Sequence, residues 1–181
     1  MSVTEAEIQS FLKDSGWDGC HHEPLAADFS TRLFARLTQE GGKTSILMQA
    51  DEDQRTEPFV HLANLMRRLG LAAPDIYASD IVRGLVIMED FGPHNVGHML
   101  DSGEDRDPFD RYAAGVLATL HKNFRQDMLG VFKTSLYNAA LFSDQVTLFL
   151  DHYYPRLFHG QATARQRSGF VEAWHEVLAP L

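Results

Sequence analysis

Patterns typical of β-strands occur only in the first half of this chain, and this asymmetry limits its possible folds more than any other feature. Up to Glu89, short apolar or alternating stretches are separated by turn-forming residues. After Pro93, apolar residues recur only at helical spacing. Strands followed by helices favour an α+β fold over an alternating α/β fold. We therefore expect two lobes, a sheet-containing one at residues 1–92 and a helical one at residues 93–181.

The first lobe is predicted to contain a leading helix and a five-stranded, mostly antiparallel sheet. Val3, Thr4 and Glu7 have the spacing of a hydrophobic staple and a capping box, which predicts a helix ending near Gly16. A turn at residues 40–43 separates two strand-like segments and predicts a β-hairpin. The expected strands are residues 23–26, 32–38, 44–48, 76–79 and 84–89. An amphipathic helix over residues 59–69 should pack on them.

The second lobe is predicted to be helical throughout. One helix is expected at residues 108–122, with Asp107 as its N-cap and Pro108 in its first turn. A second should cover residues 139–152 and be ended by Pro155, because proline cannot continue a helix. A third is expected at residues 164–178.

The composition narrows the class of protein. Hydrophobic residues make up 44% and charged residues 23%, as in soluble globular proteins. No apolar run approaches the ~20 residues of a membrane span. The net charge of −9, with scattered Lys and Arg, disfavours a nucleic-acid partner. The single cysteine can form no internal disulfide, and the histidines lack the spacing of zinc ligands. The acidic, polar start is no secretory signal, so we expect a cytoplasmic protein.

Three stretches resemble a known enzyme family. They are LAADFSTRLFAR at residues 25–36, GLVIMEDFG at residues 84–92 and YNAALF at residues 137–142. The first is similar to the first hairpin loop, the second to the fifth strand and connector, and the third to a helix of the larger lobe. The family is that of aminoglycoside phosphotransferases and choline kinases, which includes bacterial anomeric amino-sugar kinases. The resemblance implies a protein-kinase-like fold with an incomplete helical lobe.

The resemblance also implies ATP as a cofactor, Mg²⁺, and a hydroxyl of a small molecule as the acceptor. An amino sugar, an aminoglycoside or a choline-like amine would each fit. The connector would act as a hinge whose Glu89 carbonyl and Phe91 amide contact adenine. Four apolar residues would enclose the base: Leu25, Leu33, Ile46 and Met88. The implied cofactor-binding residues are Asp28, Ser30, Arg32, Met48, Glu89, Asp90 and Phe91.

The chain departs from the family pattern at two places. Residues 26–30 contain no glycine, although a loop over phosphates usually needs one for close backbone approach. Met48 or Gln49 stands where a kinase strand carries its phosphate-binding lysine. Either Mg²⁺ and another cation, such as Arg32 or Arg36, meet the phosphate charge, or the site is impaired. Glu57 has two interpretations, as the partner of such a lysine or as an acid at a helix start.

No catalytic loop of the form H-x-D-x-x-x-x-N is found, so we assign no catalytic base and no metal ligand. We therefore expect a fragment of a phosphotransferase that is inactive alone. The alternative is a non-catalytic nucleotide-binding or partner-binding module on the same scaffold. Asp90 likewise has two possible roles, holding a ribose or substrate hydroxyl, or capping the turn into Gly92.

Overall fold

The computed structural model describes residues 3–26, 32–50, 56–132 and 138–179. The chain forms two compact units, Met1–Phe132 and Lys133–Leu181. The first contains the sheet with its helices, and the second is helical, so the predicted α+β class is confirmed. This division does not test the lobe boundary after Gly92, which stays a prediction.

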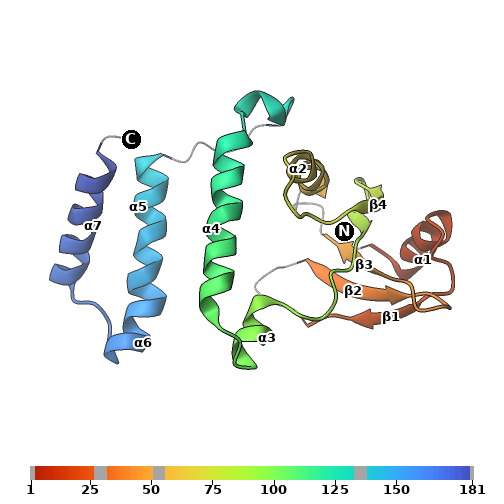
Figure 1. The fold of residues 1–181 in the computed structure, drawn as a ribbon, viewed down its shortest axis with the longest axis horizontal. Helices are drawn as coiled ribbons and strands as arrows, with labels where there is room; N and C mark the ends of the chain where they lie inside the picture. The colour runs from red at the N-terminus through yellow and green to blue at the C-terminus, as the bar shows by residue number, and fades with distance from the viewer. Residues whose placement is uncertain (1–2, 27–31, 51–55, 133–137, 180–181) are drawn as a thin grey trace. The chain divides into compact units, whose positions relative to one another are not determined.

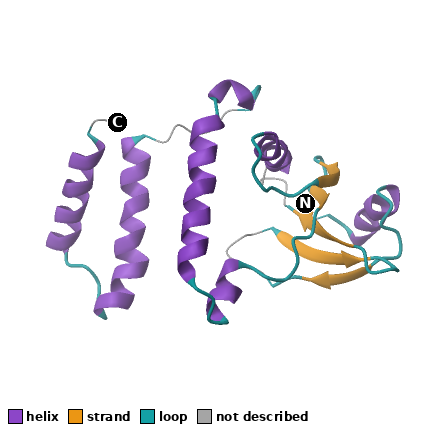
Figure 2. Ribbon diagram, viewed as in Figure 1, coloured by secondary structure: helices purple, strands orange, loops and turns teal. Residues whose placement is uncertain are grey.

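The sheet has five strands in the order β1-β2-β3-β5-β4, and every neighbouring pair is antiparallel (Figure 1). The strands are β1 (His21–Pro24), β2 (Leu33–Thr38), β3 (Thr44–Gln49), β4 (Ile76–Asp80) and β5 (Leu85–Met88). Strand β1 begins two residues before the predicted segment. The shift puts Pro24 opposite Ala35 on an edge strand, where its missing N–H leaves no gap in the sheet's interior. The predicted antiparallel sheet is confirmed (Figure 2).

The helices of the sheet unit begin and end largely where local signals place them. Helix α1 (Glu5–Asp14) has the predicted capping box, in which Thr4 and Glu7 satisfy each other's backbone N–H groups. Helix α2 (Thr56–Arg68) starts earlier than predicted and is followed by Gly70 at φ +78°. The Gly70 N–H donates to the Arg67 carbonyl, a common way to end a helix.

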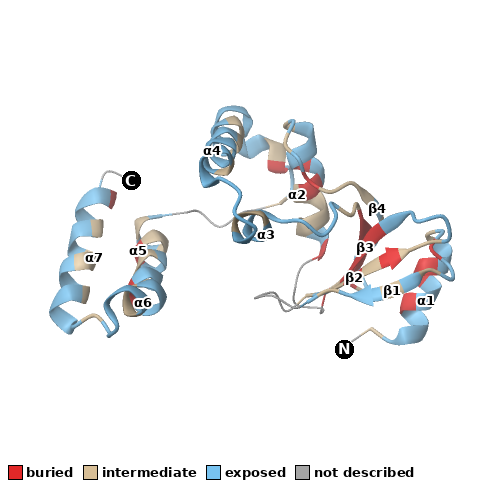
Figure 3. Ribbon diagram, turned by 60° about the horizontal axis from the view of Figure 1, so that its bottom comes forward, coloured by how far each residue is buried: buried red, intermediate tan, exposed pale blue. Residues whose placement is uncertain are grey.

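The sheet separates two apolar clusters, one on each face. Figure 3 shows buried residues in the strands and in helices α1 and α2. Alternate side chains of each strand point to opposite faces, so Leu85 and Ile87 join one cluster while Val86 and Met88 join the other. The first, here called the α1 cluster, consists of Ile8, Phe11, Leu12, Trp17, Leu37, Leu47, Leu85 and Ile87. The second, the α2 cluster, consists of Ile46, Met48, Ala50, Val86 and Met88, with Phe59 and Val60 of α2 packed against it.

The remainder of the first unit is helical. It contains α3 (Val96–Asp101), α4 (Arg106–Asn123) and a 3₁₀ turn, η1 (Gln126–Leu129). The predicted N-cap Asp107 is wrong, because α4 begins two residues earlier and Asp105 accepts the Asp107 N–H. Pro108 remains in the first turn, where a missing N–H costs nothing. After η1, the Phe132 ring packs against the His61 ring of α2, with centroids 4.1 Å apart and the planes tilted by 33°.

The second unit consists of α5 (Ala139–Leu148), a π-helical turn η2 (Phe149–Tyr153), α6 (Tyr154–Phe158) and α7 (Ala164–Leu178). The predicted end of a helix before Pro155 is wrong. The Tyr154 N–H bonds back to Phe149, one residue further than in an α-helix, and this shift leads the chain past the proline into α6. Helices α5 and α7 meet through the Phe142–Trp174 rings and a His175–Ser143 hydrogen bond.

Candidate functional site

Strand β5 leads directly into the predicted hinge, residues 89–91. The first hinge residue, Glu89, is hydrogen-bonded to the segment before β4. The Glu89 N–H donates to the Asp75 carbonyl at 2.8 Å, and the Glu89 carboxylate accepts the Asp75 N–H at 3.1 Å. Two hydrogen bonds between the same two residues restrict both the backbone and the side chain of Glu89. The hinge therefore starts from a fixed point.

Arg67 of α2 ties the helix to this point. Its Nε lies 2.8 Å from Asp75 Oδ1, and its Nη1 donates to the Ala73 carbonyl at 2.9 Å. The same Nη1 lies 3.8 Å from Glu89 Oε2. The guanidinium thus joins α2, the start of β4 and the end of β5, a use to which its planar set of donors is suited. No sequence motif indicated this network, because its members are distant in the chain and share no spacing rule.

Asp90 is held from the opposite side of the hinge by Arg36 of β2. Arg36 Nε donates to Asp90 Oδ2 at 2.7 Å, and Arg36 Nη2 donates to Oδ1 at 3.2 Å. The Gly92 N–H donates to the same Oδ1 at 2.8 Å, which is the predicted turn-capping role of Asp90. The side chains are 5% and 19% exposed for Asp90 and Arg36, so this two-point ion pair is largely shielded from water.

The Arg36 hydrogen bond is the main reason that the pKa of Asp90 lies below its ordinary value, and the Gly92 N–H and Thr44 side chain lower it further. Arg36 was one of two candidates to replace the missing lysine. In this structure the Arg36 guanidinium bonds both carboxylate oxygens of Asp90, so its positive charge is paired with that carboxylate.

Asp90→Asn is expected to lower the free energy of unfolding by about 1.5 to 3 kcal/mol at pH 7, because a charge-assisted pair becomes a neutral one. The folded-state pKa of Asp90 is lowered, so its contribution is fully present above the unfolded pKa near ~3.9. It is lost as pH falls through the folded value. Urea unfolding at several pH values should show the two proteins converging in acid. A difference that does not change with pH would contradict this account.

Between these anchors the hinge presents two backbone groups. Within the described part of the chain, neither the Glu89 carbonyl nor the Phe91 N–H has a hydrogen-bond partner. The Phe91 side chain is 63% exposed. One acceptor and one donor, two residues apart on a braced segment, have the spacing needed to pair with the edge of a planar heterocycle.

The apolar residues expected to enclose the base divide between the two faces of the sheet. Leu25, Ile46 and Met88 all belong to or pack against the α2 cluster. Leu33 does not, because it shares the face of Leu37, whose side chain is in the α1 cluster. Leu33 therefore does not share a face with the other three residues, whereas Phe34, its neighbour, packs against the α2 cluster.

Met48 is fully buried on β3, paired with Phe34 of β2 and Val86 of β5. Its side chain packs in the α2 cluster, with Ile46, Val86 and Met88. A lysine at this place would bring an ammonium into apolar surroundings. Methionine in place of the kinase lysine therefore fits the apolar surroundings of this position.

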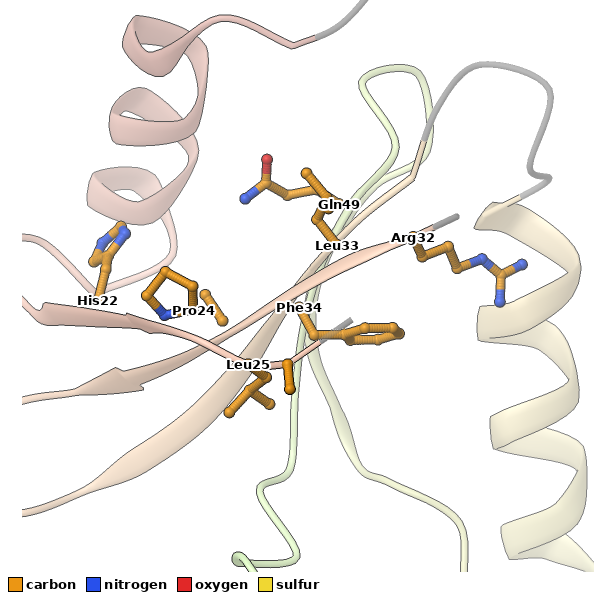
Figure 4. A pocket seen from close by; sticks show the side chains of 9 residues that line it. His22, Pro24, Leu25, Arg32, Leu33, Phe34 and Gln49 are labelled. Atoms are coloured by element: carbon orange, nitrogen blue, oxygen red, sulfur yellow. The ribbon is translucent and has the colours of Figure 1, made fainter. Parts of the chain in front are cut away.

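The loop that was expected to cover the phosphates can be followed only in part. Asp28 and Ser30 lie outside the described residues. The guanidinium of Arg32, at the end of the loop, lies over the Phe59 ring of α2, 5.5 Å from the ring centroid. Figure 4 shows the Arg32 side chain pointing toward this helix. This cation–π contact holds Arg32 on the α2 side of the sheet.

A small cavity of about 230 Å³ adjoins this end of the β1–β2 pair. Leu33 and Gln49 lie on one side of the strands, and Leu25 and Phe34 on the other (Figure 4). His22 and Pro24 of the edge strand also line it. No sequence signal indicated these last two residues, since an edge strand carries no motif.

The described residues contain neither a metal-binding cluster nor a membrane-spanning helix. No group of three or more His, Cys, Asp or Glu side chains there could hold a metal ion. None of the helices described is both long and apolar enough to cross a membrane.

Comparison with known proteins relates the chain to a bacterial sugar kinase. Over 146 residues it is 27% identical to the N-acetylmuramate/N-acetylglucosamine kinase of Caulobacter vibrioides. The match covers 65% of this chain and 40% of that enzyme's length. No family model matches the sequence. The similarity supports a kinase-like relationship, while membership of the aminoglycoside phosphotransferase family stays a prediction.

Proposed function

We propose that this chain carries the nucleotide-binding part of an ATP-dependent kinase that phosphorylates a hydroxyl of an amino sugar. The observation that carries the proposal is the hinge. The Glu89 carbonyl and the Phe91 N–H are braced on both sides and have no partner among the described residues. The similarity to a kinase of N-acetylated amino sugars supports the substrate class.

The residues around the hinge fit an adenine ring. Its amino group would donate to the Glu89 carbonyl, and the adjacent ring nitrogen would accept the Phe91 N–H. Leu25, Ile46 and Met88 on the α2 face of the sheet would supply an apolar surface for the ring. ATP supplies the phosphoryl group, and Mg²⁺ would neutralise charge on its phosphates. Within the described residues the chain offers no cluster of Mg²⁺ ligands.

Phe91→Pro tests the hinge directly, because proline has no N–H to offer the base. The variant is expected to bind ATP more weakly by about 1 to 3 kcal/mol, the cost of leaving a polar partner unsatisfied. Isothermal titration with ATP measures this. Phe91→Ala is the matched control, since it removes the exposed ring but keeps the N–H, and it should bind ATP about as well as wild type. Equal ATP affinity in folded Phe91→Pro would refute the hinge assignment.

A non-catalytic binding module is the second candidate, and the burial of Met48 in an apolar cluster favours it. The two candidates differ in phosphoryl transfer. Mass spectrometry of N-acetylmuramate and N-acetylglucosamine, incubated with ATP and Mg²⁺, would detect a sugar phosphate. The assay should use both this chain and the polypeptide of its whole reading frame. Transfer by either supports the kinase. ATP binding without transfer by either supports the binding module.

A further inference from the structure

We infer that Arg36 and Asp90 form a positioning pair that sets the base selectivity of the hinge. The inference rests on the proposed function, since it assumes that a purine nucleotide contacts residues 89–91. Neither side chain needs to touch the nucleotide. Their effect is exerted through the backbone groups on either side of Asp90.

The geometry of a peptide chain makes Asp90 the controlling residue. Peptide bonds are planar, so only the φ and ψ angles of Asp90 separate the direction of the Glu89 carbonyl from that of the Phe91 N–H. The Asp90 carboxylate is fixed by two bonds from Arg36 and one from the Gly92 N–H. These bonds to one nearly buried carboxylate hold the two angles within a narrow range.

Arg36 is well placed to supply this restraint. It lies within β2, where it pairs with Glu23 of β1 and Ile46 of β3, so its backbone cannot move independently of the sheet. Its planar guanidinium bonds both carboxylate oxygens, which fixes orientation as well as distance. A lysine would keep the positive charge but would lack the two-point geometry.

A fixed pair of backbone groups discriminates between purines. Adenine offers a donor next to an acceptor, which matches one carbonyl and one N–H. Guanine offers an acceptor next to a donor at the same edge, so both hinge groups would face groups of the same kind. A site built around such bonds rejects the wrong partner strongly because polar groups are left unpaired. If the hinge can rotate, the penalty for guanine falls, because the hinge groups can turn away from the mismatch.

The experiment compares the affinities of ATP and GTP, measured by displacement of a fluorescent ATP analogue from the 181-residue chain. Wild type should prefer ATP by at least about tenfold. Arg36→Met should lower the ATP to GTP preference by about tenfold, because ATP loses one aligned hydrogen bond and the mismatch with GTP is relieved. Arg36→Lys should also lower the ATP to GTP preference, and this variant replaces Arg36→Met in the test if Arg36→Met fails to fold.

The control is Arg83→Met, which removes an ion pair away from the hinge, 2.8 Å to Asp80 at the β4–β5 turn. It should leave the preference within about twofold of wild type. A pair that only stabilised the fold would weaken ATP and GTP equally, so an unchanged ratio in both folded Arg36 variants overturns this inference and leaves the proposed function standing. Failure of wild type to bind ATP overturns both.

Discussion

Met48→Lys is expected to lower the free energy of unfolding by about 3 to 5 kcal/mol at pH 7. The new ammonium would lie in the α2 cluster, among the apolar side chains of Ile46, Val86 and Met88. Burial of the charged form lowers the pKa of a lysine by up to ~3 to 5 units. Losing the proton instead limits the penalty at pH 7 to about 4.6 kcal/mol, since the ordinary pKa is about 10.4.

The pH dependence of the stability loss shows whether burial of the charged ammonium causes it. The folded-state pKa of the introduced lysine is lowered, so the penalty is smallest above about pH 10 and grows as pH falls toward the folded value. Urea unfolding at pH 7 and pH 10 measures the change. Met48→Leu is the control, because a similar volume is kept and less than about 1.5 kcal/mol should be lost. Wild-type stability of Met48→Lys at pH 7 would mean that a carboxylate such as Glu57 reaches the lysine, as in kinases that carry one.

Gly84→Ala is the second substitution with a large expected effect, about 2 to 4 kcal/mol. Gly84 has φ +71°, and a Cβ there would lie 2.2 Å from the Ala50 carbonyl oxygen. That carbonyl is backbone, so it cannot move aside without disturbing the Ala50 N–H bond to the Gly84 carbonyl. This bond joins the end of β3 to the start of β5.

Gly41→Ala separates the effect of the positive φ angle from the effect of the close contact with Ala50. Gly41 has φ +96° in the turn between β2 and β3, but a Cβ added there would meet no atom within 4 Å. It should therefore lose only the backbone term, about 1 to 2 kcal/mol. Denaturant unfolding of both variants gives the comparison. Equal losses at the two glycines would show that the close contact at Ala50 has no energetic effect.

Features of the fold that depend on neighbours in sequence were predictable. The capping box of Thr4 and Glu7 and the end of α2 at Gly70 were confirmed because each depends on a few consecutive residues. The errors have a common origin. Asp105 and Asp107 are both capable caps, and Pro155 can be accommodated by a π-turn as well as by a helix end. In each case the sequence allows two local solutions, and the residue types alone do not choose between them.

The candidate site was predictable where one segment makes it and not where distant segments meet. The hinge at residues 89–91 and the Asp90–Gly92 turn follow from a short motif. The Arg36–Asp90 pair joins residues 54 positions apart, and no spacing rule reaches that far. The face on which Leu33 lies depends on strand alternation counted from Leu37, which required the observed burial. Roles of the site residues toward ATP stay predictions.

The two clusters share the backbone of the central strands, and this governs how the sheet can open. Every residue of β5 is buried, as are Ser45, Ile46, Leu47 and Met48 of β3, whereas β1 and β4 carry exposed residues along their length. Strand β1 contributes no residue to the buried part of either cluster, whereas detaching β2 would expose Leu37 of the α1 cluster and opening β3 or β5 would expose both clusters at once. The hinge begins at the end of β5, so its first residue is anchored to the part of the unit that opens last.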